Sequence, residues 1–307
     1  MTETVNRKLE TDNHITVCIC TYKRPQMLAN LISKLQDQVT ENQFSYSAVV
    51  VDNDYSQSAR DIVKVWQEKS AIQVDYYWEP EQNIALARNK AVANAKGNLI
   101  AFIDDDEFPE ITWLINLLNT HNKYKAAGVL GPVKPYFEDI PPQWIIKSRV
   151  CERPSFPTGT ILMNQKETRT GNVLLSKLLF NDEEKPFNPE FGRTGGEDVD
   201  FFGRMMERGF NFVWCNEASV YEVVPPDRFK RKYHIKRALL RGVVNASKSS
   251  LLTMDTVKSA IALITYTTAL PFFLLFGQHL FMKYLIKDCD HIGKILGLLG
   301  FKIVAER

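Results

Sequence analysis

Short, fully apolar runs alternate with longer segments whose apolar residues recur every three or four positions through the first hundred residues. Consecutive apolar positions are typical of strands buried on both faces of a parallel sheet, whereas the longer period is typical of helices that pack on such a sheet. The pattern predicts strands at residues 15–20, 48–51, 74–78 and 99–103 and helices at residues 25–35, 59–68 and 84–95. Repeated strand–helix–strand units of this length indicate an α/β fold with a Rossmann-like, mostly parallel sheet flanked by helices.

Polar side chains cluster where three of the predicted strands end. The clusters are Thr21, Tyr22 and Arg24, then Asp52, Asn53 and Asp54, and finally Asp104, Asp105 and Asp106. Because the carboxyl ends of parallel strands meet at one edge of a sheet, we expect these side chains to line a crevice of nucleotide size. The sequence has neither a GxGxxG motif nor a P-loop, which argues against a dinucleotide cofactor and against phosphate binding of the P-loop type.

The three consecutive aspartates follow the strand predicted at residues 99–103. Alternate side chains of an extended segment share a face, so Asp104 and Asp106 are expected to point the same way. Two neighbouring carboxylates repel each other unless a cation lies between them, and Mg²⁺ or Mn²⁺ bound there retains positions for substrate phosphates. The alternative is a solvated acidic turn whose aspartates cap a helix before Pro109.

A second acidic pair begins a predicted helix at residues 197–208, directly after Gly195 and Gly196. The two glycines permit an unusual backbone, and the helix dipole favours the ionised forms of Glu197 and Asp198 in the first turn. Apolar residues at 201, 202, 205 and 206 cover one face of this helix. The pair either caps the helix or takes part in catalysis.

Residues 131–171 are rich in proline and charge and show no clear period. We expect an irregular stretch over the crevice that contacts an acceptor, or else a plain connecting loop. Tyr136 and Trp144 suit stacking on a sugar face, although aromatic side chains more often pack in a core.

Composition changes sharply after Pro225 and Pro226. A helix crowded with basic residues is predicted first, and residues 259–277, which carry no charge, follow it. This order favours a membrane-associating region facing anionic lipid. Pro271 interrupts the apolar stretch and lysines flank it, so we expect a kinked re-entrant or interfacial helix pair, with an amphipathic segment at residues 292–304. The soluble alternative is a buried helix or a dimer contact.

Overall composition excludes few classes of protein. The formal net charge is +2, so there is no general attraction to nucleic acid, which we do not expect as a partner. Five cysteines without a CxxC pair suit a reducing compartment, and Cys18 and Cys20 are expected in the core. Residues 1–13 are polar and lack the apolar region of a cleavable secretion signal.

Five short motifs together resemble the family 2 glycosyltransferases of the GT-A fold. They are ITVCICTYKRP at residues 15–25, VVVDND at 49–54, NIALARN at 83–89, IDDD at 103–106 and GGEDVDFF at 195–202. Their order and spacing span about residues 14–222, and the similarity in character is greatest to the bacterial enzymes that build surface polysaccharides on lipid carriers. Together with the change in composition after Pro225 and Pro226, the resemblance predicts a catalytic domain at 1–225, with a donor half at 14–108 and an acceptor half at 109–225, before a membrane-associating region at 226–307.

The resemblance also implies roles for individual residues. A nucleotide-diphospho-sugar donor would contact Thr21, Tyr22, Arg24, Asp52, Asn83, Arg88, Asn89 and Asp104, and a metal ion would bind Asp104 and Asp106. Asp198 would be the general base of an inverting transfer and Glu197 would orient the site or bind an acceptor hydroxyl. A histidine that follows the catalytic region in some relatives makes His234 a candidate metal or diphosphate ligand, or else a surface histidine.

These implications describe a metal-dependent transferase that uses Mg²⁺ or Mn²⁺ and a lipid-linked or glycan acceptor at the cytoplasmic face of the inner membrane. Two alternatives stay open at this point. A nucleotidyltransferase also uses aspartates on an α/β sheet, although it normally has a glycine-rich basic loop where this chain has TYKRP. A non-catalytic GT-A domain that serves as an assembly scaffold is the other.

Overall fold

A computed structural model describes residues 13–193, 195–246 and 253–301 of the 307-residue chain. The chain divides into two compact units. The sheet unit comprises residues 1–134 and 153–222, and the helical unit comprises residues 135–152 and 223–307. Segment 135–152 is thus grouped with the C-terminal helices, although the sequence predicts only an irregular stretch there. The predicted domain boundary after residue 225 stays a prediction.

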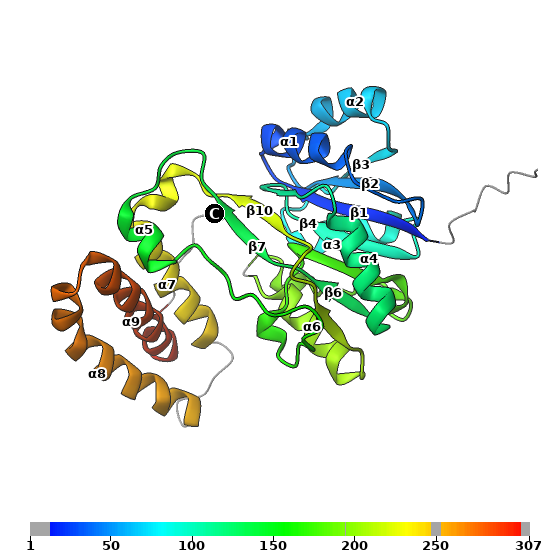
Figure 1. Ribbon diagram of the computed structural model, residues 1–307. Helices are drawn as coiled ribbons and strands as arrows, with labels where there is room; N and C mark the ends of the chain where they lie inside the picture. The colour runs from blue at the N-terminus through cyan, green and yellow to red at the C-terminus, as the bar shows by residue number, and fades with distance from the viewer. Residues whose placement is uncertain (1–12, 194, 247–252, 302–307) are drawn as a thin grey trace, which may run out of the picture. The chain divides into compact units, whose positions relative to one another are not determined.

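The sheet unit is built on a seven-stranded sheet with the order β3-β2-β1-β4-β8-β6-β9 (Figure 1). Its strands are β1 (His14–Thr21), β2 (Ser45–Asp52), β3 (Val74–Trp78), β4 (Leu99–Ile103), β6 (Gly128–Leu130), β8 (Asn172–Ser176) and β9 (Phe212–Trp214). The first four are mutually parallel, as predicted. β8 runs antiparallel to both β4 and β6, which the sequence pattern does not indicate.

A second sheet has three strands in the order β5-β10-β7. They are β5 (Glu107–Pro109), β7 (Val133–Tyr136) and β10 (Val220–Val223), and β5 pairs antiparallel with β10. Single turns of 3₁₀ helix lie at Gln165–Glu167, Lys177–Phe180, Pro189–Phe191 and Pro226–Phe229. The region 131–171 is therefore largely irregular, as predicted, apart from β7, one 3₁₀ turn and the short helix α5 (Gln143–Ser148).

Helices cover both faces of the large sheet. One face packs against α1 (Pro25–Leu35), α2 (Arg60–Lys69) and α4 (Trp113–Tyr124), and the other against α3 (Ile84–Asn94) and α6 (Glu197–Glu207). Alternation along β1 produces this division, because Val17 faces the first set of helices and Cys18 the second. Each helix and strand predicted in the first hundred residues is confirmed, with ends that differ by three residues at most.

A glycine fixes the approach of β4 to β1. A Cβ atom on Gly97 would lie 2.2 Å from the carbonyl oxygen of His14, so no other residue fits between the two strands. The backbone amide of Gly97 also donates to Thr16 Oγ1 at 2.9 Å. This close contact sets the register in which β4 delivers Asp104 to the edge of the sheet.

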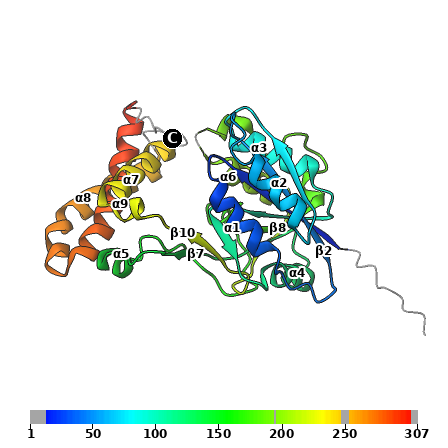
Figure 2. The ribbon, with the colours of Figure 1, turned by 90° about the horizontal axis from the view of Figure 1, so that it is seen from above.

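The helical unit gathers α7 (Arg231–Ala246), α8 (Met254–Leu275) and α9 (Gln278–Leu298) with α5 (Figures 1 and 2). Two glycines let α7 and α9 touch backbone to backbone: a Cβ on Gly242 would lie 2.2 Å from Asp290 O, and one on Gly293 would lie 2.2 Å from Leu239 O. The predicted basic helix corresponds to α7. The predicted amphipathic segment overlaps α9, but Lys302 and residues 302–304 lie outside the described residues.

The apolar stretch forms α8, and Pro271 lies inside this helix. The proline does not end the helix: its ring removes one intrahelical hydrogen bond, and the helix continues to Leu275 before a turn at Gly277 leads into α9. A helix pair is thus present as expected, while its kink and its re-entrant or interfacial placement stay predictions. Within the described residues, α8 alone is long and apolar enough to cross a membrane, with a mean hydropathy of 1.4 in its most apolar window and 6% of that window buried.

Candidate active site

The side chains that follow β1 and β4 meet at the edge of the sheet, as the sequence predicts. Asp105 accepts a hydrogen bond from Thr21 Oγ1 at 2.8 Å and another from Arg24 Nη1 at 2.9 Å. The same guanidinium nitrogen lies 2.9 Å from Asp106 Oδ2. Arg24 therefore bridges two of the three aspartates. Burial raises the pKa of Asp105, although Arg24 and Thr21 act in the opposite direction.

A buried arginine joins the two acidic motifs. Arg88 on α3 forms an ion pair with Glu197, the first residue of α6, and its other terminal nitrogen lies 3.8 Å from Asp104 Oδ1. The side chains of Arg88 and Glu197 are only 10% and 7% exposed, whereas that of Asp104 is 46% exposed. Two motifs separated by about a hundred residues thus meet around the guanidinium group of Arg88. The carboxylate of Asp104 is the partly exposed member of this group.

Glu107 is a buried acid that the sequence analysis did not single out. Its Oε2 accepts from the backbone amide of Asp104 at 3.2 Å, and its Oε1 has no hydrogen-bond partner among the described residues. Burial, followed by the neighbouring Asp104, raises the pKa of Glu107 well above its ordinary range. A Cβ on Gly171 would lie 2.9 Å from Glu107 Oε1 and 3.0 Å from Asp104 Oδ2, so the glycine leaves room beside both carboxyls.

Asp198 occupies the first turn of α6, as predicted. Gly195 and Gly196 have φ angles of +84° and +104°, in the left-handed region that favours glycine. This turn starts the helix at Glu197 and leaves Asp198 half-buried, with its Oδ1 accepting from the backbone amide of Val199 at 2.8 Å. Arg88 and Asp198 attract each other electrostatically, so Asp198 belongs to the same charged group.

Two arginines missed by the sequence analysis also face this group. Arg153 forms an ion pair with Glu222 in β10. Arg169, three residues before β8, interacts electrostatically with Arg153, Glu107 and Asp198, and burial followed by Arg153 lowers its pKa. They come from the irregular region 131–171, where no periodic pattern distinguishes a site residue from a surface one.

Asn83 and Asn89 connect α3 to the segment that precedes α6. The side chain of Asn83 caps α3 by accepting from the amides of Ala85 and Leu86, and it donates to Pro189 O at 2.9 Å. Asn89 exchanges two hydrogen bonds with the backbone of Phe187, at 2.8 and 2.9 Å. Both predicted donor-binding residues therefore have structural contacts that hold the segment before α6 against α3.

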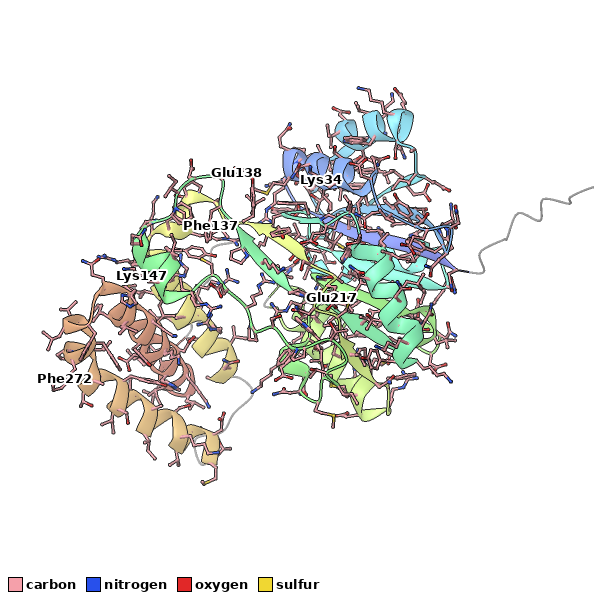
Figure 3. The ribbon with its side chains drawn as sticks, in the orientation of Figure 1. Lys34, Phe137, Glu138, Lys147, Glu217 and Phe272 are labelled. Carbon is pink, nitrogen blue, oxygen red and sulfur yellow. The ribbon has the colours of Figure 1, made fainter. Side chains whose placement is uncertain are left out.

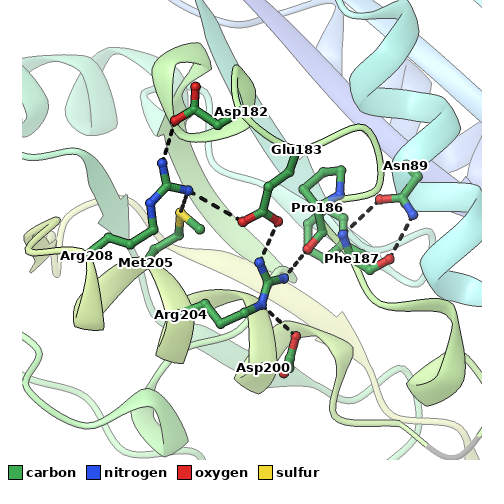
Figure 4. A network of polar contacts seen from close by, with 9 residues as sticks. All are labelled: Asn89, Asp182, Glu183, Pro186, Phe187, Asp200, Arg204, Met205 and Arg208. Carbon is green, nitrogen blue, oxygen red and sulfur yellow. Dashed lines mark hydrogen bonds and ion pairs between the residues drawn. The ribbon is translucent and has the colours of Figure 1, made fainter.

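Arginines on α6 and directly after it hold the same segment from the other side (Figure 4). Arg204 pairs with Asp200 at 3.0 Å and with Glu183 at 2.5 Å, and it donates to Pro186 O at 2.5 Å. Arg208 pairs with Asp182 at 2.6 Å. The segment at residues 182–191 is thus tied to both α3 and α6, which explains how a largely irregular segment can position the start of α6.

Asp52 lies fully buried at the end of β2. Its carboxylate accepts from the amides of Ala59 and Asp54 at 2.8 and 3.0 Å and from the Tyr76 hydroxyl at 3.2 Å. The Asp52 side chain therefore shapes the loop that follows β2.

Tyr22, after β1, is half-exposed, with the Lys23 ammonium 5.0 Å from the centre of its ring.

His234 lies on α7 in the helical unit. Its Nε2 makes a hydrogen bond of 2.7 Å with Arg228 O, and its ring lies edge-on to Trp144. Trp144 is buried there, consistent with a packing role. Burial lowers the pKa of His234.

The carboxylates at this edge of the sheet are the available donors for a metal ion. Within the described parts of the chain, no group of three or more His, Cys, Asp or Glu side chains is arranged to hold an ion. Mg²⁺ and related ions are often held by one or two protein carboxylates, with substrate phosphates and water as the other ligands. Asp104 and Asp106 supply two carboxylates of this kind, so the donor set fits a cation that arrives with a phosphate substrate.

Comparisons with known sequences agree with this geometry. The family model described as "Glycosyl transferase family 2" matches residues 16–181. The chain is 30% identical over 306 residues to the succinoglycan biosynthesis protein ExoM of Rhizobium meliloti, covering 95% of each chain. It is 23% identical to the chondroitin synthase of Pasteurella multocida, over 70% of this chain and 25% of that protein.

Solved structures share the fold. TarS 1–349 from S. aureus, in complex with UDP, superposes with a TM-score of 0.52 at 16% identity and covers 95% of this chain and 94% of its own. The mannosyltransferase PcManGT from Pyrobaculum calidifontis, in complex with GDP-Man and Mn²⁺, gives a TM-score of 0.61 at 16% identity, with 92% and 87% covered.

Proposed function

The chain belongs to glycosyl transferase family 2, and we propose that it transfers a sugar from a nucleoside-diphosphate sugar to a hydroxyl group of a glycan acceptor, with inversion at the anomeric carbon. The observation that carries this proposal is the meeting of Asp104 with the Glu197–Asp198 pair around buried Arg88. Family membership favours sugar transfer over the nucleotidyltransferase and scaffold alternatives.

The donor is assigned to the edge formed by β1, β2 and β4. Thr21, Tyr22 and Arg24 would contact the base and ribose, and Asp52, which also orders the loop after β2, would lie beside the base. Arg88 would attract the diphosphate, with Asn83 and Asn89 holding the crevice floor beneath the donor. The UDP and GDP-Man complexes of TarS and PcManGT, which share the fold, support a nucleotide-bearing donor.

A divalent cation, Mg²⁺ or Mn²⁺, is proposed to bind between the carboxylates of Asp104 and Asp106 and the donor phosphates. When bound it would offset the negative charge that develops on the departing nucleoside diphosphate. Arg24, which pairs with Asp106 here, is close enough to hold the carboxylate in place before donor arrives. The Mn²⁺ in the PcManGT complex supports this assignment.

Asp198 is proposed as the general base. It is half-buried, its one described hydrogen bond is to a neighbouring amide, and it interacts electrostatically with Arg88. A carboxylate in this state can take the proton of an acceptor hydroxyl as that oxygen attacks the anomeric carbon from the side opposite the leaving group. A single attack of this kind inverts the configuration. Glu197, buried against Arg88, would orient Arg88 and the start of α6.

The acceptor is proposed to be a lipid-linked glycan at the cytoplasmic face of the membrane. The similarity to a succinoglycan biosynthesis protein over 95% of both chains supports a role in polysaccharide synthesis. The exposed apolar surface of α8 supports attachment to the membrane through residues 226–307, while residues 1–225 carry the donor and acceptor sites.

Binding of a panel of nucleoside-diphosphate sugars, measured by thermal shift with and without Mn²⁺, tests the proposal. We expect one donor to stabilise the protein in a Mn²⁺-dependent way, and Asp104→Asn to remove that stabilisation. The matched control is Asp75→Asn, because Asp75 lies near the amino end of β3, at the opposite edge of the sheet, and pairs with Lys96. Equal responses of the two variants would contradict the assignment of Asp104.

A further inference from the structure

The helical unit contains a cavity of about 730 Å³, a volume within the range of small-molecule binding sites. Its lining residues come from α5, the 3₁₀ turn before α7, the start of α7 and the connection between α8 and α9. They are Pro142, Gln143, Trp144, Lys147, Phe229, Arg231, Phe276, Gly277, Gln278 and His279. None of these residues takes part in the proposed transfer reaction.

The polar lining is cationic or neutral. Lys147 and Arg231 are positively charged, and there is no carboxylate among the described residues that line the cavity. Lys147 is exposed and has no ion pair with any described residue. Arg231 donates a hydrogen bond to Gln278, which fixes its guanidinium group at the wall of the cavity. Two cations without a lining acid favour an anionic ligand, and lysine and arginine are the usual partners of phosphate.

The lining also contains three aromatic side chains, those of Trp144, Phe229 and Phe276. Phe276 directly follows α8 and is 71% exposed. Further apolar side chains along α8 are more than half exposed, namely Met254, Ile261, Ile264, Phe272, Leu274 and Leu275. Figure 3 shows Phe272 pointing away from the helix and its neighbours. The cavity therefore lies at the end of the helix whose uncovered apolar side chains suit the hydrocarbon region of a membrane.

We propose that this cavity binds the phosphate head of a lipid whose hydrocarbon chain lies along α8. Lys147 and Arg231 contact the phosphate, and Trp144, Phe229 and Phe276 contact the first carbons of the chain. Resting on the proposed function, the lipid is the phosphate-bearing carrier of the acceptor glycan. The charge of the lining and its continuity with the apolar face of α8 together select a lipid phosphate rather than a soluble phosphate ester.

The test is sedimentation of the full-length protein with phosphatidylcholine vesicles that contain a small fraction of polyprenyl phosphate. We expect Lys147→Gln and Arg231→Gln each to weaken binding roughly fivefold or more, since one cation near a charged lipid surface is worth about that factor. Lys283→Gln is the matched control, because Lys283 is an exposed lysine of α9 outside the cavity. Phe276→Ser should also weaken binding, without altering the charge.

Two further arms separate the possible sources of phosphate. Replacing polyprenyl phosphate by an equal fraction of phosphatidylglycerol should reduce binding, and free inorganic phosphate should not compete. Equal losses in Lys283→Gln and Lys147→Gln, or full competition by inorganic phosphate, would overturn the proposal. Circular dichroism of each variant establishes folding, and the double variant Lys147→Gln/Arg231→Gln must retain the donor response of the wild type. Wild-type protein that binds no nucleotide sugar would refute the proposed function but leave the vesicle result standing.

Discussion

The buried ion pair between Arg88 and Glu197 leads to a quantitative prediction. Arg88→Met removes the cation and leaves the carboxylate of Glu197 buried, with a side chain only 7% exposed and an Oε2 that has no partner among the described residues. Removing one member of a buried pair costs about 3–5 kcal/mol, because the remaining charge is uncompensated. We expect Arg88→Met to lower the free energy of unfolding by an amount in this range.

The reciprocal change should cost less. Glu197→Leu leaves Arg88 with Asp104, whose carboxylate lies 3.8 Å away and is partly solvated. We therefore expect Glu197→Leu to lower the free energy of unfolding by about 3 kcal/mol, near the lower end of that range. In the double variant neither charge is left alone, so its loss should be smaller than the sum of the single losses by about 2–3 kcal/mol, the upper range of coupling energies between contacting residues.

Urea unfolding followed by tryptophan fluorescence suits this measurement, because Trp66, Trp78, Trp113 and Trp214 all belong to the sheet unit. Asp182→Asn is the control: Asp182 pairs with Arg208 at 2.6 Å, but its side chain is 71% exposed. An exposed pair contributes about 1 kcal/mol or less. The account would be refuted if Arg88→Met and Glu197→Leu each lowered the free energy of unfolding by less than that value and if their effects were additive in the double variant. The ion pair would then not behave as a buried one.

Two other predictions follow from burial and close packing. Burial raises the pKa of Glu107 above its ordinary value of 4.5, so its stabilising contribution is complete below that pH and is lost as the pH rises through the folded-state value. Glu107→Gln should therefore flatten the decline of unfolding free energy above pH 4.5, as measured by urea unfolding across pH. Gly293→Leu should destabilise the helical unit, because its Cβ would meet Leu239 O at 2.2 Å; hydrogen exchange of α7 and α9 that matches the wild type would contradict this.

Local patterns were sufficient to predict the first half of the fold. The apolar runs of β1, β2 and β4 are buried on both faces, so nearly every position carries the signal, and Pro25 and Asn83 mark the starts of α1 and α3. The antiparallel β8 was missed because a buried strand has the same composition in either direction. The continuation of α8 through Pro271 was missed because the sequence does not show whether a long apolar helix is stable enough to tolerate the loss of one hydrogen bond at a proline.

The candidate site was predictable only where residues follow a strand or begin a helix. Asp104, Asp106 and Asp198 occupy such positions, and the structure brings Asp104 and Asp198 to the same buried arginine. Arg169 and Arg153 come from an irregular region, so only tertiary structure places them near Glu107 and Glu222. The second contacts of Asn83 and Asn89, to residues about a hundred positions away, could not be derived from a local pattern for the same reason.

The role of Asp198 is the central claim, and transfer measured together with donor affinity tests it most directly. Asp198→Asn keeps the shape of the side chain but cannot accept a proton, so sugar transfer to the acceptor should fall by about 10²–10⁴, the usual contribution of a general base. Donor affinity, measured by titration calorimetry with Mn²⁺, should remain near the wild-type value. A variant that transfers sugar at the wild-type rate, or one whose donor affinity falls in parallel with its rate, would contradict the assignment of Asp198 as the base.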